Sequence, residues 1–412
     1  MNMLKRALFV VSAFTMLCQT GLSGQGLRQT ALSLWDRLIT PNAKLDSAWI
    51  FQPYKGWQAA PQYDISFVGV GLTGDLLFHD DEGDVQAHFR LDLDERPFQS
   101  VGAHVAYGPL RLGLSREVGN RGDANKSTSF KYLSSGYGLE FRYLQTSSLV
   151  SASMWGDDKD DAVEFETKDP SRQKSLVVDG FYALNCRRFS YIAAYNARVV
   201  QKRSAGSVLL AAKYMQGMVT LDYRDFMVMA MVWDLGRFST IQASAGAGYS
   251  YNLVLLHRDA AGSRDLRGLR NVTFNVTAVP MLTWYNAVYS QQYEYLSWDE
   301  AAEEYGRIHG LPEDFDELAY MSEIDEYFYS RFKLGKKQKE TGRLQPNFIA
   351  RTALSYTTGR FYMSLGADYN MFRFKGKERR YKLEALSDDY VAAKSNARFS
   401  TWAVSLELNY RF

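Results

Sequence analysis

The amino-acid sequence predicts an all-β fold, a transmembrane antiparallel β-barrel, and a period of two in polarity is the first observation behind this prediction. Apolar and polar residues alternate from Val85 to Asp94, and the alternation recurs at residues 271–278 and 360–371. Such a pattern is typical of strands with one apolar and one hydrated face. Many of the alternating runs are longer than the roughly 9 to 11 residues that a tilted strand needs to cross a bilayer. This length favours a barrel with its apolar face toward lipid over a soluble β-sandwich.

The second observation is an N-terminus with the parts of a secretory signal peptide. Lys5 and Arg6 precede an apolar run at residues 7–17, and small residues follow as far as Gly24. We expect cleavage near Gly24, which leaves Cys186 as the only cysteine and excludes an internal disulfide. The predicted regions are a signal peptide at 1–24, an N-terminal periplasmic segment at 25–60 and an outer-membrane barrel at 61–412.

The third observation is an amphipathic C-terminal strand that ends in an aromatic residue. Trp402, Tyr410 and Phe412 lie in one period-two file of "TWAVSLELNYRF". This arrangement resembles the signal that the β-barrel assembly machinery recognises, and such a strand can add to the edge of a sheet. We therefore expect the outer membrane as the location, with the assembly machinery, outer-membrane lipid and lipopolysaccharide as partners.

The stretch "LNCRRFSYIAAYNARVVQKRSAGS" mixes basic, aromatic and small residues. We interpret it as a tight turn at Cys186 followed by a strand at 188–202, with its aromatic residues toward lipid. Arg188 and Arg198 would then face a watery lumen. Lys and Arg total 48 and Asp and Glu total 46, so no overall basic field attracts nucleic acid, and no nucleic-acid partner is expected.

Two parts of this region resemble a known family. "GFYALNCRRFSYIAAYN", followed by "QKRSAGSVLLAAKY", is similar to the core signature of the domain of unknown function 4421 family of exported bacterial proteins. The likeness extends to "DSAWIFQPYKGW" and "GAGYSYNLV", with Ile192 in place of the expected Pro and Cys186 in place of the expected Asn. The resemblance implies an outer-membrane barrel and no known activity.

The alternation predicts about fourteen strands. They are expected near residues 62–79, 84–95, 100–118, 128–144, 146–156, 174–185, 188–202, 206–216, 218–234, 237–257, 271–286, 345–358, 360–374 and 398–412. By parity, the long connections at 119–127, 157–173, 287–344 and 375–397 all lie on one side, predicted to be external. Twelve strands is the alternative, because Gly108-Pro109 interrupts the third strand and the connection at 258–270 is long for a periplasmic turn.

Helices are expected in two places outside the strands. The external insert at 294–343 breaks the alternation, and Ser297 and Glu300 have the spacing of a capping box. Gly310 is predicted to end a first helix and Pro312 to begin a second. A short helix is also predicted at residues 27–38, at the periplasmic mouth.

Polar residues at inward positions are the candidate functional residues. Besides Arg188 and Arg198, the predicted lumen-facing residues are His88, Arg90, Asp92, Asp94 and His104. A tight turn between strands 84–95 and 100–118 would make the two histidines neighbours. No inward Ser or Cys accompanies them at a suitable spacing, so we expect a hydrogen-bonded lumen network and no enzyme activity.

Motifs for metals and cofactors are incomplete in this sequence. "GVGLTG" satisfies the dinucleotide glycine pattern but lies within a strand, with no helix after it to hold a pyrophosphate. The acidic groups at 80–84 and 157–161 lack the spacing of a calcium loop. We expect no metal and no cofactor.

Three functions remain open at this point. We favour a channel or small-solute conduit, which needs an open polar lumen. The first alternative is a structural or docking barrel with a plugged lumen, in which the helical insert performs recognition. The second alternative is an outer-membrane hydrolase. Lumen diameter is the property that best separates the three, because a barrel of this size has room for a pore or for a packed interior.

Overall fold

The computed structural model describes residues 45–412, apart from 54–55, 81–82, 95–96, 119–124, 157, 169, 197, 226–227, 229–233, 263–264, 311–316, 377–378 and 383–389. The predicted signal peptide and the predicted helix at 27–38 lie outside the described residues, as does Pro312. None of the helices within the described residues is both long and apolar enough to span a membrane.

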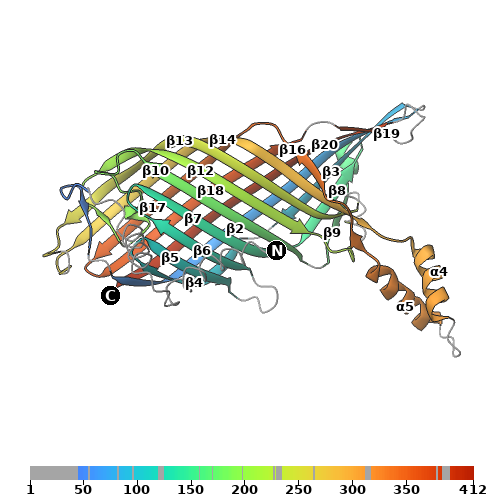
Figure 1. Cartoon of the computed structure of the whole chain (residues 1–412), viewed down its shortest axis with the longest axis horizontal. Helices are drawn as coiled ribbons and strands as arrows, with labels where there is room; N and C mark the ends of the chain where they lie inside the picture. Colours follow the sequence, from blue (N-terminus) through green and yellow to red (C-terminus); the bar gives the residue numbers. More distant parts are fainter. Residues whose placement is uncertain are drawn as a thin grey trace, which may run out of the picture. The chain divides into compact units, whose positions relative to one another are not determined.

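Twelve antiparallel strands close into a ring (Figure 1). In ring order they are β2 (Trp57–Asp80), β4 (Phe98–Tyr107), β5 (Leu110–Glu117), β6 (Lys126–Leu133), β7 (Tyr137–Ser148), β10 (Ser171–Ala183), β12 (Ala205–Thr220), β13 (Leu235–Arg258), β14 (Arg270–Glu294), β17 (Gln345–Thr358), β18 (Phe361–Lys375) and β20 (Tyr390–Arg411). The predicted all-β antiparallel barrel is confirmed. The ring has twelve strands, which was the alternative to the predicted fourteen.

Short strands extend this ring at one end or lie beside it. They are β1 (Ile50–Phe51), β3 (Gly83–Asp94), β8 (Val150–Trp155), β9 (Val163–Glu166), β11 (Val200–Gln201), β15 (Lys333–Leu334), β16 (Gln338–Thr341) and β19 (Arg379–Lys382). β1 and β11 form a separate two-stranded sheet. A single 3₁₀ turn, η1 (Lys159–Asp161), joins β8 to β9.

The strands β3 and β4 lie end to end along β2. The upper part of β2 pairs with β3 and its lower part with β4, and both pairings are antiparallel. The two strands therefore run in the same direction, and the tight turn expected between them is wrong. The reason is that alternation locates strands but carries no information on whether successive strands reverse direction.

Two predicted strands are hairpins. Residues 100–118 divide into β4 and β5 at a turn in which Gly108 has a φ of 55°. Residues 128–144 divide into β6 and β7 at a turn near Ser134. At both turns the exposed apolar file changes parity, from Val105 to Leu112 and from Phe130 to Phe141. The prediction overlooked this change of phase.

Two further predicted strands are absent from the described part of the structure. Residues 188–202 contain a 3₁₀ turn, η2 (Tyr191–Ala194), and only the short β11. At the predicted strand 218–234, Met218–Thr220 end β12 and a turn follows at residues 223–224. The two absent strands lower the number of strands, and the two missed hairpins raise it. The predicted number of strands was therefore close, although several strand boundaries were wrong.

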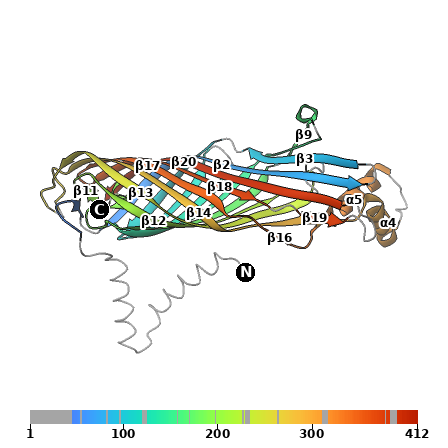
Figure 2. The same ribbon diagram turned by 90° about the horizontal axis from the view of Figure 1, so that it is seen from above.

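The connections between strands lie at the two ends of the barrel (Figures 1 and 2). One end, the C-terminal mouth, carries Phe412, the turns at 108–109 and 359–360, and the segment 184–204. The other end, the loop mouth, carries the connection from β14 to β17, which includes the helices α4 (Trp298–His309) and α5 (Glu317–Ser330). The predicted capping box of Ser297 and Glu300 is present, and Gly310 caps the end of α4 with a φ of 75°.

The inner and outer faces exchange polarity along the barrel. Next to the C-terminal mouth, large apolar side chains cover the outer face, among them Val101, Leu112, Leu114, Leu210, Tyr251, Val276, Trp284, Leu354, Leu365 and Leu408. We call this band the apolar belt. Closer to the loop mouth, apolar residues such as Leu72, Leu91 and Phe399 are buried inside the ring. Exposed polar residues such as Arg90 and Arg398 take the outer positions there.

Phe412 lies at the end of the apolar belt and closes the ring against β2. Its backbone nitrogen donates to Trp57 at 3.1 Å, its ring lies edge-on to Tyr410, and its side chain is 67% exposed. Phe361, at the same mouth, is 63% exposed and packs on the same Tyr410 ring. The two phenylalanines therefore have similar surroundings and differ in whether they end the chain.

We predict that Phe412→Glu lowers the amount of protein in the outer membrane severalfold, whereas Phe361→Glu has a small effect. A charge near the membrane interface costs only about 0–1 kcal/mol, so a large loss points to recognition of the terminal residue. Quantitative immunoblots of outer-membrane fractions measure this. Equal losses in the two variants would instead assign the defect to solvation.

Candidate functional site

The barrel interior is the candidate site, and its first layer is the segment 184–204 at the C-terminal mouth, which we call the plug. It leaves the wall after β10 and returns at β12. Phe189, Tyr191 and Ile192 are buried, and η2 packs against β13, β14 and β17. The prediction of a wall strand with lipid-facing aromatic residues is therefore wrong here. An aromatic and small-residue alternation suits burial inside the barrel as well as it suits lipid.

Hydrogen bonds fix the plug to the surrounding wall. The Tyr195 hydroxyl donates to Asn275 at 2.6 Å, and the amide of Asn252 donates to the carbonyl of Ser190 at 2.8 Å. Asn271 donates to the carbonyl of Gln201 at 2.8 Å. Buried polar groups are stabilising only when they are paired, and this network pairs those of the plug with the wall and so holds the plug inside the mouth.

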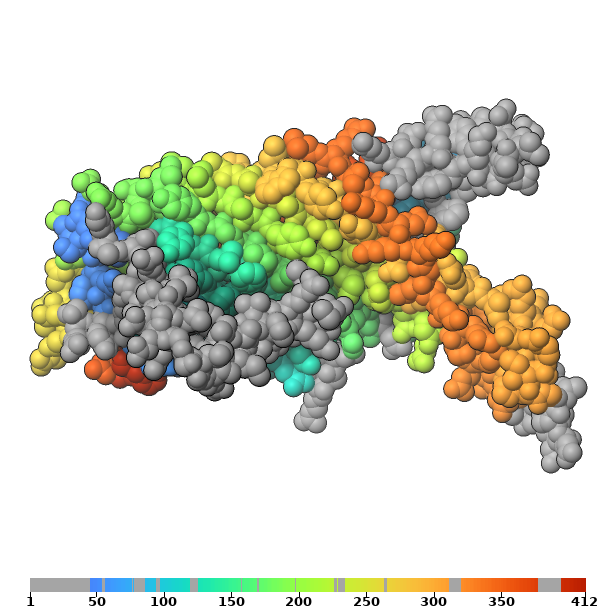
Figure 3. Space-filling view, in the orientation of Figure 1, coloured from blue at the N-terminus to red at the C-terminus, as the bar shows by residue number. Residues whose placement is uncertain are grey.

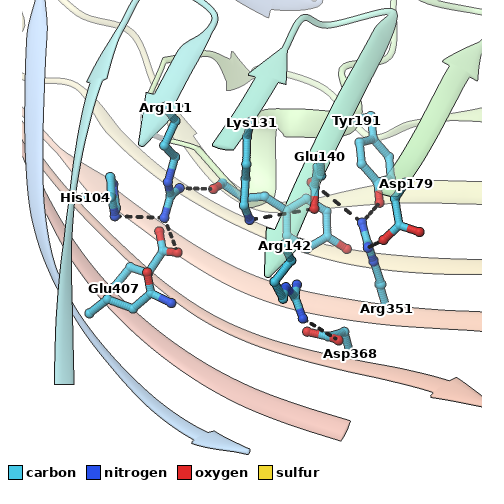
Figure 4. Close-up of polar contacts among 12 residues, drawn as sticks. His104, Arg111, Lys131, Glu140, Arg142, Asp179, Tyr191, Arg351, Asp368 and Glu407 are labelled. Carbon is cyan, nitrogen blue, oxygen red and sulfur yellow. Dashed lines mark hydrogen bonds and ion pairs between the residues drawn. The ribbon is translucent and has the colours of Figure 1, made fainter. Parts of the chain in front are cut away.

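The second layer is a charged cluster that crosses the middle of the barrel (Figure 4). The Arg351 guanidinium donates to Asp179 at 2.9 Å and lies 3.7 Å from Glu140. Lys213 Nζ lies 3.3 Å from Asp179 and also donates to Asn370. These side chains come from β17, β10, β7, β12 and β18, so the contacts join distant parts of the wall.

A further ion pair spans the full ring. Arg142 on β7 lies 3.7 Å from Asp368 on β18, and these two strands are opposite each other in the ring order. The cluster also touches the plug, because Arg351 donates to the Tyr191 hydroxyl at 3.1 Å. The middle layer therefore braces the wall from side to side and holds the plug from above.

A second charged group lies beside β4, β5 and β20. Arg111 is 2.5 Å from Glu407 and 2.8 Å from His104 Nδ1, and His104 Nε2 lies 2.8 Å from Asn409. The Arg111 and His104 side chains are 3% exposed. Glu407 compensates the buried charge of Arg111, and His104 contacts Arg111 and Asn409 but no hydroxyl or thiol in this group.

The third layer is apolar and lies toward the loop mouth. It contains Val70, Leu93, Met215, Phe238, Phe374 and Phe399, from strands all around the ring. A void of about 10 Å³ remains beside Phe238 and Phe374, about the volume that one water needs. Lys213 lies 5.2 Å from the ring of Phe372, so the charged and apolar layers are in direct contact.

The structure places the predicted lumen residues in different environments. His104 and Arg198 are buried inside, and Arg198 donates to the carbonyl of Leu133 at 3.1 Å. Arg188 is largely exposed at the mouth, 5.5 Å from the ring of Trp49. It does not line a lumen, because the plug that carries it is not a wall strand.

His88, Arg90 and Asp92 lie on the outer face of β3. Their register places them beside Asp75, Thr73 and Gly71, whereas Leu91 and Leu93 belong to the internal apolar layer. The lumen-facing interpretation of these three residues is wrong, because polarity is inverted toward the loop mouth. His88 contacts Asp75 at 2.9 Å and Trp155 by stacking, far along β2 from the level of His104. For Asp94 the register gives a backbone partner, Gly69.

Several residues of the charged cluster were not among the predicted candidates. They are Arg111, Lys131, Glu140, Arg142, Lys213, Arg351, Asp368 and Glu407. Each of them occupies a polar position in an alternating strand, and this is the signal that could have found them. The alternating pattern does not show which of these side chains form ion pairs with each other across the ring.

The chemistry of the described interior is that of paired charges and amides. Within the described residues, no group of three or more His, Cys, Asp and Glu side chains is arranged to hold a metal ion. His104 contacts an arginine and an amide, and neither is a nucleophile. The arrangement is suited to filling the interior and bracing the wall.

Comparison with known families supports the resemblance found in the sequence. Residues 84–261 match the family model described as Domain of unknown function (DUF4421). The predicted resemblance is confirmed over these residues. The DUF4421 match runs from β3 into the loop after β13 and so includes the plug. No curated protein matches the chain.

The chain also has some likeness to solved structures, of which three of low identity follow. The outer membrane protease OmpT from Escherichia coli is 8% identical over 87% of this chain and 97% of that chain, with a TM-score of 0.35. The P. putida toluene transporter TodX is 8% identical over 87% and 90%, with a TM-score of 0.19. A Pseudomonas aeruginosa FadL homologue is 8% identical over 87% and 90%, with a TM-score of 0.17. Likenesses of this size carry no argument about function.

We predict that Asp179→Ala destabilises the barrel strongly, because Arg351 and Lys213 both lose a buried counter-charge. Breaking a buried ion pair from one side costs about 3–5 kcal/mol. The readout is the temperature at which the folded gel band of unboiled, detergent-solubilised protein is lost. The matched control is Asp265→Ala, which removes the exposed pair with Arg267 and should leave that temperature unchanged. Equal behaviour of the two variants would contradict a role for the cluster.

Proposed function

We propose that this chain is an outer-membrane β-barrel with a sealed lumen that serves as a docking barrel, in which α4 and α5 form the recognition element. The observation that carries the proposal is the ion pairing across the ring, from Arg142 to Asp368 and from Arg351 to Asp179. Contacts between opposite walls narrow the lumen at that level, where the Arg142 and Asp368 side chains keep exposed fractions of 34% and 20%.

The apolar belt supports the membrane location. Exposed apolar residues such as Leu114, Trp284 and Leu408 lie on the outside of a closed sheet, where water would hydrate them unfavourably. A closed barrel also satisfies all backbone hydrogen bonds of its wall, as lipid requires. The belt surrounds the part of the barrel next to the C-terminal mouth, and we place the bilayer there.

The three internal layers support a sealed lumen over an open conduit. A diffusing solute would have to pass the plug, the charged cluster and the apolar layer in turn. The plug alone involves buried Phe189 and Ile192, and the apolar layer resembles the core of a soluble protein in burial. We therefore prefer the docking barrel to the channel that the sequence pattern favoured.

The connection from β14 to β17 contains the regular helices α4 and α5, and it projects beyond the end of the barrel as the orange part of the space-filling view (Figure 3). Trp298 donates to Asp325 at 2.9 Å and Tyr305 donates to Glu323 at 2.6 Å, which joins the two helices. At their base, Phe332 stacks on Tyr295 with ring centres 4.5 Å apart. Aromatic packing of this kind holds the helical pair to the end of β14.

The capping box at the start of α4 makes its stability depend on pH. Hydrogen bonds from the backbone and hydroxyl of Ser297 lower the pKa of Glu300. A carboxyl whose pKa is lowered by folding stabilises the helix above its unfolded pKa, and that contribution is lost as pH falls through the folded pKa. The helical pair is therefore best ordered when Glu300 is ionised.

We expect no stepwise conductance from the purified wild-type protein in planar lipid bilayers, because each of the three layers blocks ions. An open general porin in the same membrane gives the positive control, and heat-dependent gel migration verifies that the inserted protein is folded. Steady conductance steps from folded wild-type protein would overturn the sealed lumen and restore the channel.

We expect an epitope tag inserted after Gly310 to bind antibody on intact cells, because α4 and α5 lie at the loop mouth. The matched control is the same tag in the turn at Gly359, at the C-terminal mouth, which should bind only after the cells are permeabilised. Flow cytometry measures both. The reverse pattern would place the helices in the periplasm and remove their role in external recognition.

A further inference from the structure

A groove of about 720 Å³ lies on the outer face of the barrel and is lined mainly by residues of β18, β20, β2 and β3. These four strands are successive neighbours in the sheet (Figure 2). Gly69 and Gly71 of β2 form its floor, and the Phe67 ring and the Asp92 carboxylate lie next to them, each 3.0 Å from the position that a Cβ of the glycine would take. Arg90 on one side and Arg398 and Arg373 on the other form its walls. They are two of the three glycines of the "GVGLTG" motif, and a larger residue at either position would crowd Phe67, Ser400 or Asp92.

The charges of this groove are unbalanced. Arg373 and Arg398 are direct partners in the β18–β20 ladder, and both are exposed on the outer face. Like charges directly opposite each other in an antiparallel pair are destabilising. Lys375 follows two residues along β18 and faces Asn396. Within the described residues, no ion pair joins Arg373, Lys375 or Arg398 to a carboxylate, whereas Arg90 is paired with Asp92.

The position of the groove fits the headgroup level of the membrane. Trp402 stacks on Phe67 with ring centres 5.9 Å apart and is the ladder partner of Tyr369, which makes an aromatic cluster at the edge of the apolar belt. Aromatic residues of this kind mark the membrane interface in barrels. Arg398 lies four residues before Trp402 in β20. For a tilted strand, this places Arg398 about 10 Å from the aromatic cluster in the direction of the loop mouth.

We propose that this groove binds the phosphorylated headgroup of an outer-leaflet glycolipid, with Arg373, Arg398 and Lys375 as the phosphate-binding residues. This rests on the proposed membrane location of the barrel. A phosphate between the two facing arginines removes their repulsion and accepts charge-assisted hydrogen bonds from both. The sugar units fit the glycine floor, and the acyl chains continue past Phe67 and Trp402 onto the apolar belt. Polar contacts from Thr73 and Asn396 along the groove suit sugar hydroxyls.

The test is binding of bisphosphorylated lipid A to the full-length protein in detergent, followed by native mass spectrometry. We expect Arg373→Ser/Arg398→Ser to weaken binding by about tenfold or more, since charged hydrogen bonds are lost. The matched control is Arg258→Ser/Arg270→Ser, which removes another facing arginine pair at the C-terminal mouth and should leave binding unchanged. Heat-dependent gel migration verifies that both variants are folded.

Three outcomes would overturn the proposal. Equal binding by the wild type and the groove variant removes the arginines from the site. Equal weakening in the groove and control variants shows a general charge effect. Displacement of lipid A by millimolar inorganic phosphate assigns the groove to free phosphate instead of lipid. A protein that conducts ions yet shows the predicted lipid A binding would refute the sealed lumen and leave this site standing.

Discussion

The ion pairs across the middle of the barrel are the interaction on which the rest of the structure depends. A charge in a buried interior is tolerated only when an opposite charge lies within contact distance. Asp179, Arg351 and Lys213 meet this condition only if β10, β17 and β12 are held at one level and the ring is closed. The cluster thus specifies the relative register of strands that are far apart in the sequence. It also supports the plug from above, through the contact of Arg351 with Tyr191.

The sequence predicted the strands well where alternating polarity has one structural explanation, namely lipid outside and a polar interior. The strands at 361–375 and at the C-terminus were found because their outer apolar file is regular over residues 361–371 and 402–412. The terminal file from Trp402 to Phe412 is indeed outward, and Glu407 and Asn409 point inside. A period of two is sufficient in these strands, since the lower wall has lipid on one side and a polar interior on the other.

The prediction failed where the same pattern has two physical explanations. In β3, Leu91 and Leu93 alternate with Arg90 and Asp92, and alternation alone does not tell which file is inside. In the plug, Phe189 and Tyr191 alternate with small and polar residues, but the chain turns into the barrel. The pairing of Arg142 with Asp368 was also beyond reach, because it depends on ring closure and register, which a local pattern does not contain.

Because the polarity of the two faces is exchanged along the wall, the outer face of one β-sheet contacts lipid near the C-terminal mouth and water near the loop mouth. Around the apolar belt, a position facing outward should accept hydrophobic replacements and reject charged ones, and inward positions should do the reverse. Near Arg398 and Leu91 these preferences change sides, while the strands themselves continue. Along a single strand such as β2, the positions that tolerate apolar residues should therefore change from the outward file to the inward file partway along the strand. The residue at which that reversal occurs would locate the membrane boundary from sequence variation alone, independently of any lipid measurement.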